Sequence, residues 1–233
     1  MKTKTGAIVQ ARMSSSRFPG KVLHIVSGKP MLLYLLERLK RCTSLDMIVV
    51  ATSSDNTDTV IAELCGQLDL PCFRGSLTDV AGRFKDATAE YQLDAFVRVN
   101  GDSPLLDQNL IDKAVNIFLD SDCDLVTNLM PATYPKGQSI EVLRSKTYRQ
   151  AYDSFKEDDE REHVTPYFYK HTEDFRIYNF SYKQNINDIK LCVDTPADMD
   201  MFAAIISNMD KPHTEYSLED ILRIYHELSH SIK

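Results

Sequence analysis

The sequence lacks any apolar run approaching the roughly 20 residues that a membrane-spanning helix needs. It also lacks a signal-peptide pattern and any tract rich in Ser, Gly or Pro that would indicate disorder. Hydrophobic residues make up 43% and charged residues 26% of the 233 residues, as in ordinary globular proteins. We therefore expect a cytoplasmic protein without membrane contact, folded as one large α/β domain over residues 1–233.

Cysteines in metal-binding or paired spacing are also missing. The five cysteines are scattered, with no CxxC spacing and no companion His pairs: Cys42, Cys65, Cys72, Cys123 and Cys192. This pattern disfavours structural zinc and favours buried, reduced thiols in a reducing compartment.

The chain has no excess of positive charge, because its formal net charge is −7. This charge disfavours nonspecific nucleic-acid binding driven by bulk charge as a function. Yet basic residues gather near the start, where Glu37 is the only acid among the first forty: Arg12, Arg17, Lys21, Lys29, Arg38 and Lys40. A basic patch on an acidic protein favours a small polyanionic ligand, and a solvated surface is the alternative.

Short apolar runs alternate with amphipathic segments along the chain. The runs predict strands at 6–10, 47–52, 71–74, 94–100, 124–128, 139–143 and 189–193. The amphipathic segments predict helices at 30–39, 55–64, 79–91, 108–119, 146–155 and 165–171, and from 195 and 217. This succession predicts a doubly wound, mainly parallel α/β sheet with helices on both faces. Ligands of such sheets lie beyond the carboxyl ends of the strands.

The regular alternation loosens between about residues 132 and 185. Aromatic and charged segments replace the βα rhythm there, including a charged stretch at 158–163. We expect a small insertion or flap in this range rather than a separate domain.

The first predicted strand leads into Gln-Ala-Arg-Met-Ser-Ser-Ser-Arg-Phe-Pro-Gly-Lys, residues 10–21. Small residues let the backbone approach a phosphate, and Arg12, Arg17 and Lys21 supply permanent positive charge. The pattern GxxxxGK[ST] of common ATPases and GTPases fails, because Ser15 replaces its first Gly and Val22 its hydroxyl residue. The run therefore predicts a phosphate-binding loop of another kind, with a basic surface loop as the alternative.

Two carboxylates follow predicted strands. Asp102 comes after 94–100, and Asp194 comes after 189–193 and before Thr-Pro-Ala-Asp. Carboxylates at neighbouring strand ends can share Mg²⁺, which prefers oxygen ligands and retains waters and phosphate oxygens. An Asp before a Pro-containing helix start is equally expected as a turn or helix cap.

Seven runs together resemble one family. They are AIVQARMSSSRFPGKVL, VVATS, FRGS, VRVNGDSPLLD, YPKGQSIEV, EREHVTPY and LCVDTPADM, in this order over nearly the whole chain. The combination resembles cytidylyltransferases that make CMP-activated acidic sugars, and most closely the spore-coat polysaccharide biosynthesis branch. The resemblance implies a Rossmann-like, GT-A-type nucleotidyltransferase fold. It also implies transfer of CMP from CTP to an acidic 2-keto sugar, with release of pyrophosphate and Mg²⁺ or Mn²⁺ as cofactor.

The resemblance assigns roles to particular residues. It implies catalytic roles for Arg12, Arg17 and Lys21, and metal binding by Asp102 and Asp194. The expected nucleotide contacts are Gln10, Ala11, Arg12, Ala51, Thr52, Arg74, Ser76 and Asn100. The expected acceptor contacts lie in the range 132–185: Gln138, Glu141, Arg161, Glu162 and His163.

This sequence departs from the sialic acid branch at one position. Where that branch has Asp-x-Asp, the residues here are Cys192-Val193-Asp194. A thiol is a poor magnesium ligand, so a single Asp is expected from this segment and the number of metal ions stays open. Legionaminic, pseudaminic, sialic and Kdo-like acids all remain candidate acceptors. Related enzymes are often dimers, which makes a homodimer compatible with the resemblance and leaves the oligomeric state open.

Three other functions compete. One is a nucleotidyltransferase for a sugar 1-phosphate or another base. The second is a metal-dependent glycosyltransferase, for which Asp120-Ser-Asp122 and Asp122-Cys-Asp124 offer DxD patterns. These patterns precede a predicted strand and so fall at the wrong end of the sheet for a ligand site. The third is a nucleotide-binding module without catalysis.

Overall fold

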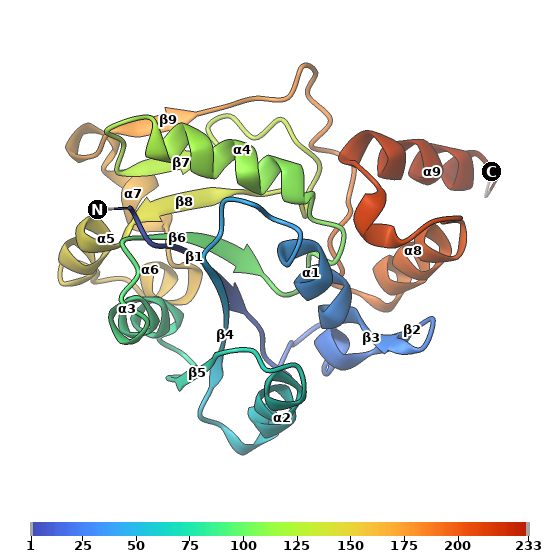
Figure 1. The fold of residues 1–233 in the computed structure, drawn as a ribbon, viewed down its shortest axis with the longest axis horizontal. Helices are drawn as coiled ribbons and strands as arrows, with labels where there is room; N and C mark the ends of the chain where they lie inside the picture. Colours follow the sequence, from blue (N-terminus) through green and yellow to red (C-terminus); the bar gives the residue numbers. More distant parts are fainter. Residues whose placement is uncertain (1, 232–233) are drawn as a thin grey trace.

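A seven-stranded sheet runs through the computed structural model, which describes residues 2–231 (Figure 1). Its strand order is β5-β4-β1-β6-β8-β7-β9. The strands are β1 (Thr5–Gln10), β4 (Met47–Ser53), β5 (Cys72–Gly75), β6 (Ala95–Asn100), β7 (Leu125–Thr127), β8 (Glu141–Arg144) and β9 (Ile177–Asn179). The pairs from β5 to β6 and the pair β7–β9 are parallel, while β8 is antiparallel to both neighbours. A small hairpin outside this sheet consists of β2 (Ile25–Val26) and β3 (Lys29–Pro30).

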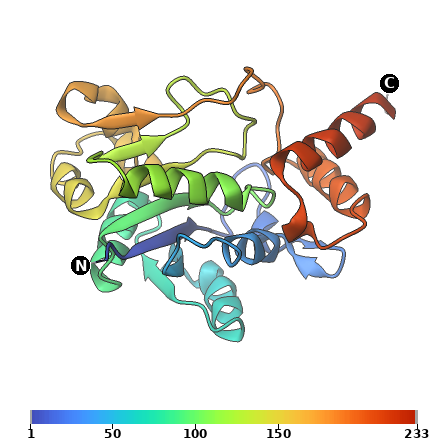
Figure 2. The same ribbon diagram turned by 45° about the horizontal axis from the view of Figure 1, so that its top comes forward.

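Helices cover both faces of the sheet, and the turned view in Figure 2 shows α4 and α1 in front of it. The α-helices are α1 (Met31–Leu39), α2 (Thr59–Gln67), α3 (Val80–Glu90), α4 (Gln108–Leu119), α5 (Ser145–Tyr152), α6 (Asp158–His163), α7 (Pro166–Lys170), α8 (Pro196–Ser207) and α9 (Leu218–Ser231). Short 3₁₀ turns are η1 (Lys21–Leu23), η2 (Asn56–Asp58), η3 (Thr172–Asp174) and η4 (His213–Glu215). No helix in the described range is both long and apolar enough to cross a membrane.

The central strands are apolar because both of their faces are buried. In β1, Ala7 and Val9 belong to the hydrophobic core that contains α1, α2 and α4. Ile8, between them, points to the other face and joins the core that contains α3 and α5. Successive side chains of a strand alternate between faces, so a continuous apolar run fills two cores at once. The predicted doubly wound, mainly parallel sheet is confirmed.

Two strands come from the range 132–185. β8 lies between β6 and β7 inside the main sheet, and β9 forms its edge. This range therefore supplies part of the central sheet as well as α5 to α7. β9, β2 and β3 were not expected from the sequence, since each has only two or three residues and carries too little periodicity to stand out.

The prediction of a strand at 189–193 is wrong. This segment makes an isolated bridge between Lys190 and Lys136, and the Leu191 N–H donates to the Lys136 carbonyl at 2.8 Å. Gly137 allows this close approach, because it has φ +94° and an added Cβ would lie 2.7 Å from the Cys192 nitrogen. The apolar pattern was correct about burial, since Leu191 and Val193 are buried, but it could not distinguish a strand from a packed extended loop.

Arg38 joins the loop after β6 to the C-terminal segment. Its side chain is fully buried and donates to the carbonyl oxygens of Leu106 at 2.7 Å, His213 at 2.6 Å and Tyr216 at 2.8 Å. Burial lowers the pKa of Arg38 to about 10, so it stays charged at neutral pH. A basic residue that the sequence had placed in a ligand patch is therefore structural.

Candidate active site

A pocket of about 280 Å³ opens at the carboxyl ends of β1 and β6. Its walls come from the end of β1, the loop 11–22, the turn 100–102 after β6, the first turn of α3 and the end of α6, with Asp194 opposite. This is the place where doubly wound sheets bind ligands. Strand register brings the walls together, since Gln10 at the end of β1 is paired with Asn100 at the end of β6.

Lys21 lies at the floor of this pocket. Its side chain is only 8% exposed, and its Nζ lies 2.9 Å from Asp102 Oδ2 and 3.2 Å from Asp194 Oδ1. The Val193 carbonyl accepts a third hydrogen bond from Nζ at 2.6 Å. Gly20, with φ +75°, makes the turn that directs the chain from the loop into η1, where Lys21 is the first residue.

Asp194 is held by three cations. Arg17 donates to its Oδ1 at 2.9 Å, and Lys190 lies 3.3 Å from its Oδ2. Burial alone would raise the pKa of Asp194, but Lys21 and Lys190 outweigh it and hold the pKa below its ordinary value. The carboxylate is therefore ionised at neutral pH and available to a cation.

The loop 11–22 is anchored by a buried carboxylate. Asp58 accepts from the Met13 N–H at 2.7 Å and from the Ser53 N–H at 3.1 Å. This fixes the loop against the end of β4. Arg12, the residue before Met13, lines the pocket and forms an ion pair with Glu162 of α6 at 3.3 Å. The loop thus presents cations from a fixed backbone.

Asp102 and Asp194 meet because the backbone between their segments is closely packed. The Val193 N–H donates to the Asp102 carbonyl at 2.8 Å. Asp194 immediately precedes the Thr195 cap of α8, and Asp198 of the same helix accepts from the Asp194 N–H at 3.0 Å. Asp194 is therefore positioned by a helix start without capping that helix itself.

Gly101→Ala is expected to destabilise the protein by about 1–3 kcal/mol, as overpacking in a dense core does. An added Cβ would lie 2.8 Å from the Gln10 carbonyl oxygen, which is backbone and has little freedom to move. Urea unfolding measures the loss. Gly66→Ala in α2 is the matched control, since nothing lies within 4 Å of its added Cβ. Equal stability of the two variants would contradict the close packing at Gly101.

Asp198→Asn tests the acid dependence of this segment. Burial raises the pKa of Asp198, but Lys190, the Asp194 N–H and Thr195 outweigh it and lower the value to about 2. Because the folded pKa lies below the unfolded one, the stabilisation is fully present above about pH 4 and is lost as the pH falls towards 2. We expect Asp198→Asn to lose roughly 1–2 kcal/mol at pH 7.

The difference from the wild type should shrink between pH 4 and pH 2. Thermal unfolding at pH 7, 4 and 2.5 measures it, with the exposed Asp200 of the same helix, as Asp200→Asn, for control. A difference that stays constant down to pH 2.5 would show that the carboxylate charge is not what stabilises α8.

The donor set of Asp102 and Asp194 fits a hard divalent cation. Both are carboxylates, which supply the oxygen ligands that such a cation prefers. Both also contact the ammonium group of Lys21, so the two side chains are close enough to share one positive charge. Burial, followed by the charges of Asp102 and Asp194, raises the pKa of Cys192 to about 11. Cys192 is therefore a neutral thiol and a poor ligand for Mg²⁺.

Most of the predicted phosphate, metal and nucleotide residues line the pocket together. They are Gln10, Ala11, Arg12, Arg17, Lys21, Asn100, Asp102 and Asp194, joined by Glu162 and His163 from the predicted acceptor set. Asn100 has a buried Oδ1 without a hydrogen-bond partner, which leaves an acceptor for a ligand.

Four predicted nucleotide contacts lie outside the pocket wall. Ala51 and Thr52 are fully buried in β4. Arg74 turns away and donates to the carbonyl oxygens of Ser53 at 3.0 Å and Asp55 at 2.8 Å. The Ser76 hydroxyl accepts from the Asp79 N–H at 3.0 Å and so orders the turn before α3. These residues do lie at or near strand ends, as predicted. Their side chains, however, are buried or make hydrogen bonds within the protein.

The predicted acceptor residues divide similarly. Gln138 is fully buried, with its amide bonded to the Asp107 N–H and the Leu105 carbonyl, so the structure corrects this prediction and assigns it to loop packing. Glu141 is buried in an ion pair with Arg98 at 2.8 Å. Arg161 bonds Tyr152 and the Phe155 carbonyl and lines a neighbouring pocket.

Two arginines in the pocket wall were not predicted. Arg83 comes from α3 and Arg98 from the middle of β6. Arg98 interrupts an otherwise apolar central strand, and that interruption was a usable signal. Arg83 sits in an ordinary amphipathic helix, where a single Arg carries no pattern.

A second pocket, of about 430 Å³, adjoins the first. The two pockets share Asn100, Asp102 and Asp194. The rest of its wall mixes apolar and polar residues, and the polar ones include Asn128, Tyr134, Lys136, Ser139 and Asn187. The paired carboxylates therefore stand at the junction of a cationic pocket and a polar one.

Val164 carries backbone strain beside these pockets. It is fully buried with φ +73° and ψ −47°, and the Thr165 N–H donates to the His163 carbonyl at 2.8 Å. This is a γ-turn of the strained kind, rare for a β-branched residue. The turn directs His163 into the first pocket, and strain of this sort gathers at functional sites.

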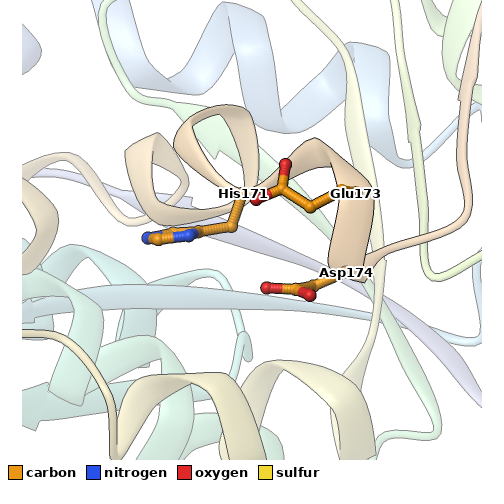
Figure 3. Close-up of side chains that lie close together, drawn as sticks. All are labelled: His171, Glu173 and Asp174. Atoms are coloured by element: carbon orange, nitrogen blue, oxygen red, sulfur yellow. The ribbon is translucent and has the colours of Figure 1, made fainter.

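One further group of potential metal ligands occurs in the described part of the chain, formed by His171, Glu173 and Asp174 (Figure 3). The two acids are exposed, and the His171 ring contacts the Tyr167 ring at a tilt of 38°, with centroids 4.3 Å apart. It lies in the turn around η3, away from the carboxyl ends of β1 and β6. Nothing connects it to the pockets described above.

A doubly wound sheet with a cationic pocket and paired carboxylates beyond its strand ends is the arrangement expected of a nucleotidyltransferase. Its fixed cations suit a polyphosphate, and the adjoining polar pocket suits a second substrate.

Comparison with known proteins agrees. A family model described as cytidylyltransferase matches residues 6–226. The spore coat polysaccharide biosynthesis protein SpsF of Bacillus subtilis is 29% identical over 205 residues, covering 85% of this chain and 84% of SpsF. The 3-deoxy-manno-octulosonate cytidylyltransferase 2 of Hydrogenovibrio crunogenus is 34% identical over 151 residues, covering 64% of this chain and 61% of that protein. The structure of a cytidylyltransferase from Leptospira borgpetersenii has a TM-score of 0.93 at 29% identity, covering 98% of this chain and 96% of the other. This chain belongs to the cytidylyltransferase family.

Proposed function

We propose that this enzyme transfers CMP from CTP to a hydroxyl group of an acidic 2-keto sugar, a nonulosonic or Kdo-like acid, and releases pyrophosphate. One observation carries the proposal. The cationic pocket and the polar pocket share Asp102 and Asp194, so two substrates bound in them would meet at these carboxylates. The relative named 3-deoxy-manno-octulosonate cytidylyltransferase 2 supports an acidic sugar, and the relative named for spore coat polysaccharide biosynthesis supports a sugar substrate.

The cationic pocket suits the triphosphate. Arg12 and Arg17 have guanidinium groups that can hold two phosphate oxygens each, and Lys21 supplies a compact charge at the pocket floor. Each of these groups already contacts a carboxylate before the nucleotide arrives, which limits the reorganisation needed for charge neutralisation. Asn100 offers its free amide oxygen to the nucleotide.

Asp102 and Asp194 would hold Mg²⁺ (or Mn²⁺). When bound, such an ion neutralises phosphate charge and polarises the phosphorus that is attacked. Lys21 contacts both carboxylates, so the protein keeps this site charge-balanced before any ion binds.

The polar pocket suits the sugar acid. Lys136 provides a positive charge for the sugar carboxylate, and Ser139 and Asn187 provide hydrogen bonds for hydroxyl groups. Glu162 and His163 line the adjoining cationic pocket from α6. We assign the acceptor to the polar pocket because it reaches both metal-binding carboxylates.

The reaction is a displacement at the α-phosphorus. The acceptor oxygen forms a bond to this phosphorus, the bond from phosphorus to the bridging oxygen breaks, and pyrophosphate leaves with that oxygen. The hydroxyl proton is lost to solvent. No covalent enzyme intermediate is needed, because positioning and charge neutralisation supply the rate enhancement.

Pyrophosphate release tests the proposal. The assay contains Mg²⁺, each of CTP, ATP, GTP and UTP, and a panel of nonulosonic and octulosonic acids beside sugar 1-phosphates. We expect release with CTP and one acid only. Release with a sugar 1-phosphate, or with another nucleotide in preference to CTP, would overturn the proposal.

A further inference from the structure

Arg83 is a buried cation without a salt bridge to any residue in the described part of the chain. It is 2% exposed, on the first turn of α3, and it lines the wall of the cationic pocket. One of its terminal nitrogens donates to the Ser76 carbonyl at 3.2 Å. Its Nε is buried without a hydrogen-bond partner. Within residues 2–231, no carboxylate oxygen lies within 4.0 Å of its guanidinium group.

Arg38 shows what a satisfied buried arginine looks like in the same protein. Its Nε and both terminal nitrogens each donate to a backbone carbonyl, and Asp107 lies 4.0 Å away. Both arginines are buried in helices, yet only Arg83 faces a pocket and keeps an unused donor. Packing alone therefore does not explain why Arg83 is an arginine.

The surroundings of Arg83 make its buried charge more destabilising. Burial, followed by the like charge of Arg12, lowers the pKa of Arg83 to about 10, and the charges of Asp58 and Asp79 only partly offset these two effects. Arg83 is still charged at neutral pH, and a buried charge without a direct salt bridge is destabilising. An anion placed between Arg12 and Arg83 would remove both problems.

The end of β5 is shaped around this side chain. A Cβ added at Gly75 would lie 2.7 Å from Arg83 Cγ and 3.1 Å from the Phe73 ring. Gly75 thus leaves room for the stem of Arg83 to pass towards the pocket. A glycine in a strand weakens that strand, so the arrangement gives up some stability to place this guanidinium.

We propose that Arg83, together with Arg12, binds a phosphate group of the nucleotide. This assignment rests on the proposed CTP-dependent function and adds a binding residue to it. Arg83 lines the pocket from α3, whereas Arg12, Arg17 and Lys21 line it from the loop 11–22. The phosphate chain is then held by cations from two separate segments of the chain.

Binding of CTP and of cytidine, measured by calorimetry, separates a phosphate contact from contacts to the nucleoside. We expect Arg83→Met to weaken CTP binding by on the order of 10- to 100-fold, the usual effect of a lost charge-assisted hydrogen bond. Cytidine, which has no phosphate, should bind within twofold of wild type. Arg83→Lys keeps the charge and should recover part of the CTP affinity.

Thermal unfolding without ligand provides the second readout. Arg83→Met should unfold at the wild-type temperature or above it, because an unpaired charge is replaced by a similar apolar volume. Arg38→Met is the matched control and should unfold at a lower temperature, since it leaves three carbonyls without donors.

The outcomes are distinct. Unchanged CTP affinity in Arg83→Met, or equal weakening of CTP and cytidine, would overturn the assignment while wild-type CTP binding still stands. A drop in unfolding temperature as large as that of Arg38→Met would make Arg83 structural and would also overturn it. Failure of the wild type to bind CTP would instead overturn the proposed function, and this assignment with it.

Discussion

Lys21→Ala is expected to lower turnover with CTP by on the order of 10²- to 10³-fold, the range found when one preorganised charge is removed from a transition state. Lys21 is the only cation in the described structure that contacts both Asp102 and Asp194. Without its ammonium group, the two carboxylates face the incoming triphosphate with one less opposing charge. Single-turnover formation of pyrophosphate measures the chemical step directly.

Lys190→Ala is the matched control for this prediction. Lys190 also pairs with Asp194, at 3.3 Å, and with Asp198, at 2.7 Å, but it lies outside the cationic pocket. We expect it to reduce stability while leaving turnover within a few-fold of wild type. Circular dichroism checks that each variant is folded. A folded Lys21→Ala protein with wild-type turnover would remove the phosphate-loop interpretation.

The sequence predicted the parts of this fold that are long and periodic. β1, β4, β6 and α4 appear where the apolar runs and helical spacing placed them, within about two residues. The site location followed from one rule, because residues just after parallel strands meet at one edge of the sheet. Asp102 and Lys21 are far apart in sequence, yet their contact follows from that rule and from the loop after β1.

Side-chain use within the protein was not predictable. Arg74 and Gln138 lie close to strand ends, as the rule requires, but backbone carbonyls and an N–H group occupy their polar groups. Arg83 shows the opposite case, since nothing in its local pattern marks it and only the fold brings it to the pocket. Such distinctions depend on tertiary hydrogen bonds, which leave no trace in local sequence.

Asp102→Asn and Asp194→Asn are expected to lower Mg²⁺-dependent turnover by on the order of 10²-fold or more, with a loss of stability of about 1 kcal/mol. Each change keeps the shape of the side chain and removes one metal-binding charge. The metal role makes a second, sharper prediction for CTP binding. In EDTA, where the carboxylates only repel the triphosphate, each variant should bind CTP as tightly as wild type or more tightly.

With Mg²⁺ present, the same variants should bind CTP more weakly than wild type, so the order of affinities reverses. Asp122→Asn is the control, because Asp122 belongs to both DxD patterns and its side chain is 82% exposed beside Arg176. It lies before β7, at the opposite edge of the sheet from the pockets, and turnover should not change. A loss of Mg²⁺-dependent turnover in Asp122→Asn, with normal activity in Asp102→Asn, would move the metal to the DxD segment and favour a glycosyltransferase. A reversed order of CTP affinities in Asp102→Asn and Asp194→Asn would instead place the metal where the two pockets meet. A carboxylate at that position repels the metal-free nucleotide and binds the Mg²⁺ that accompanies it.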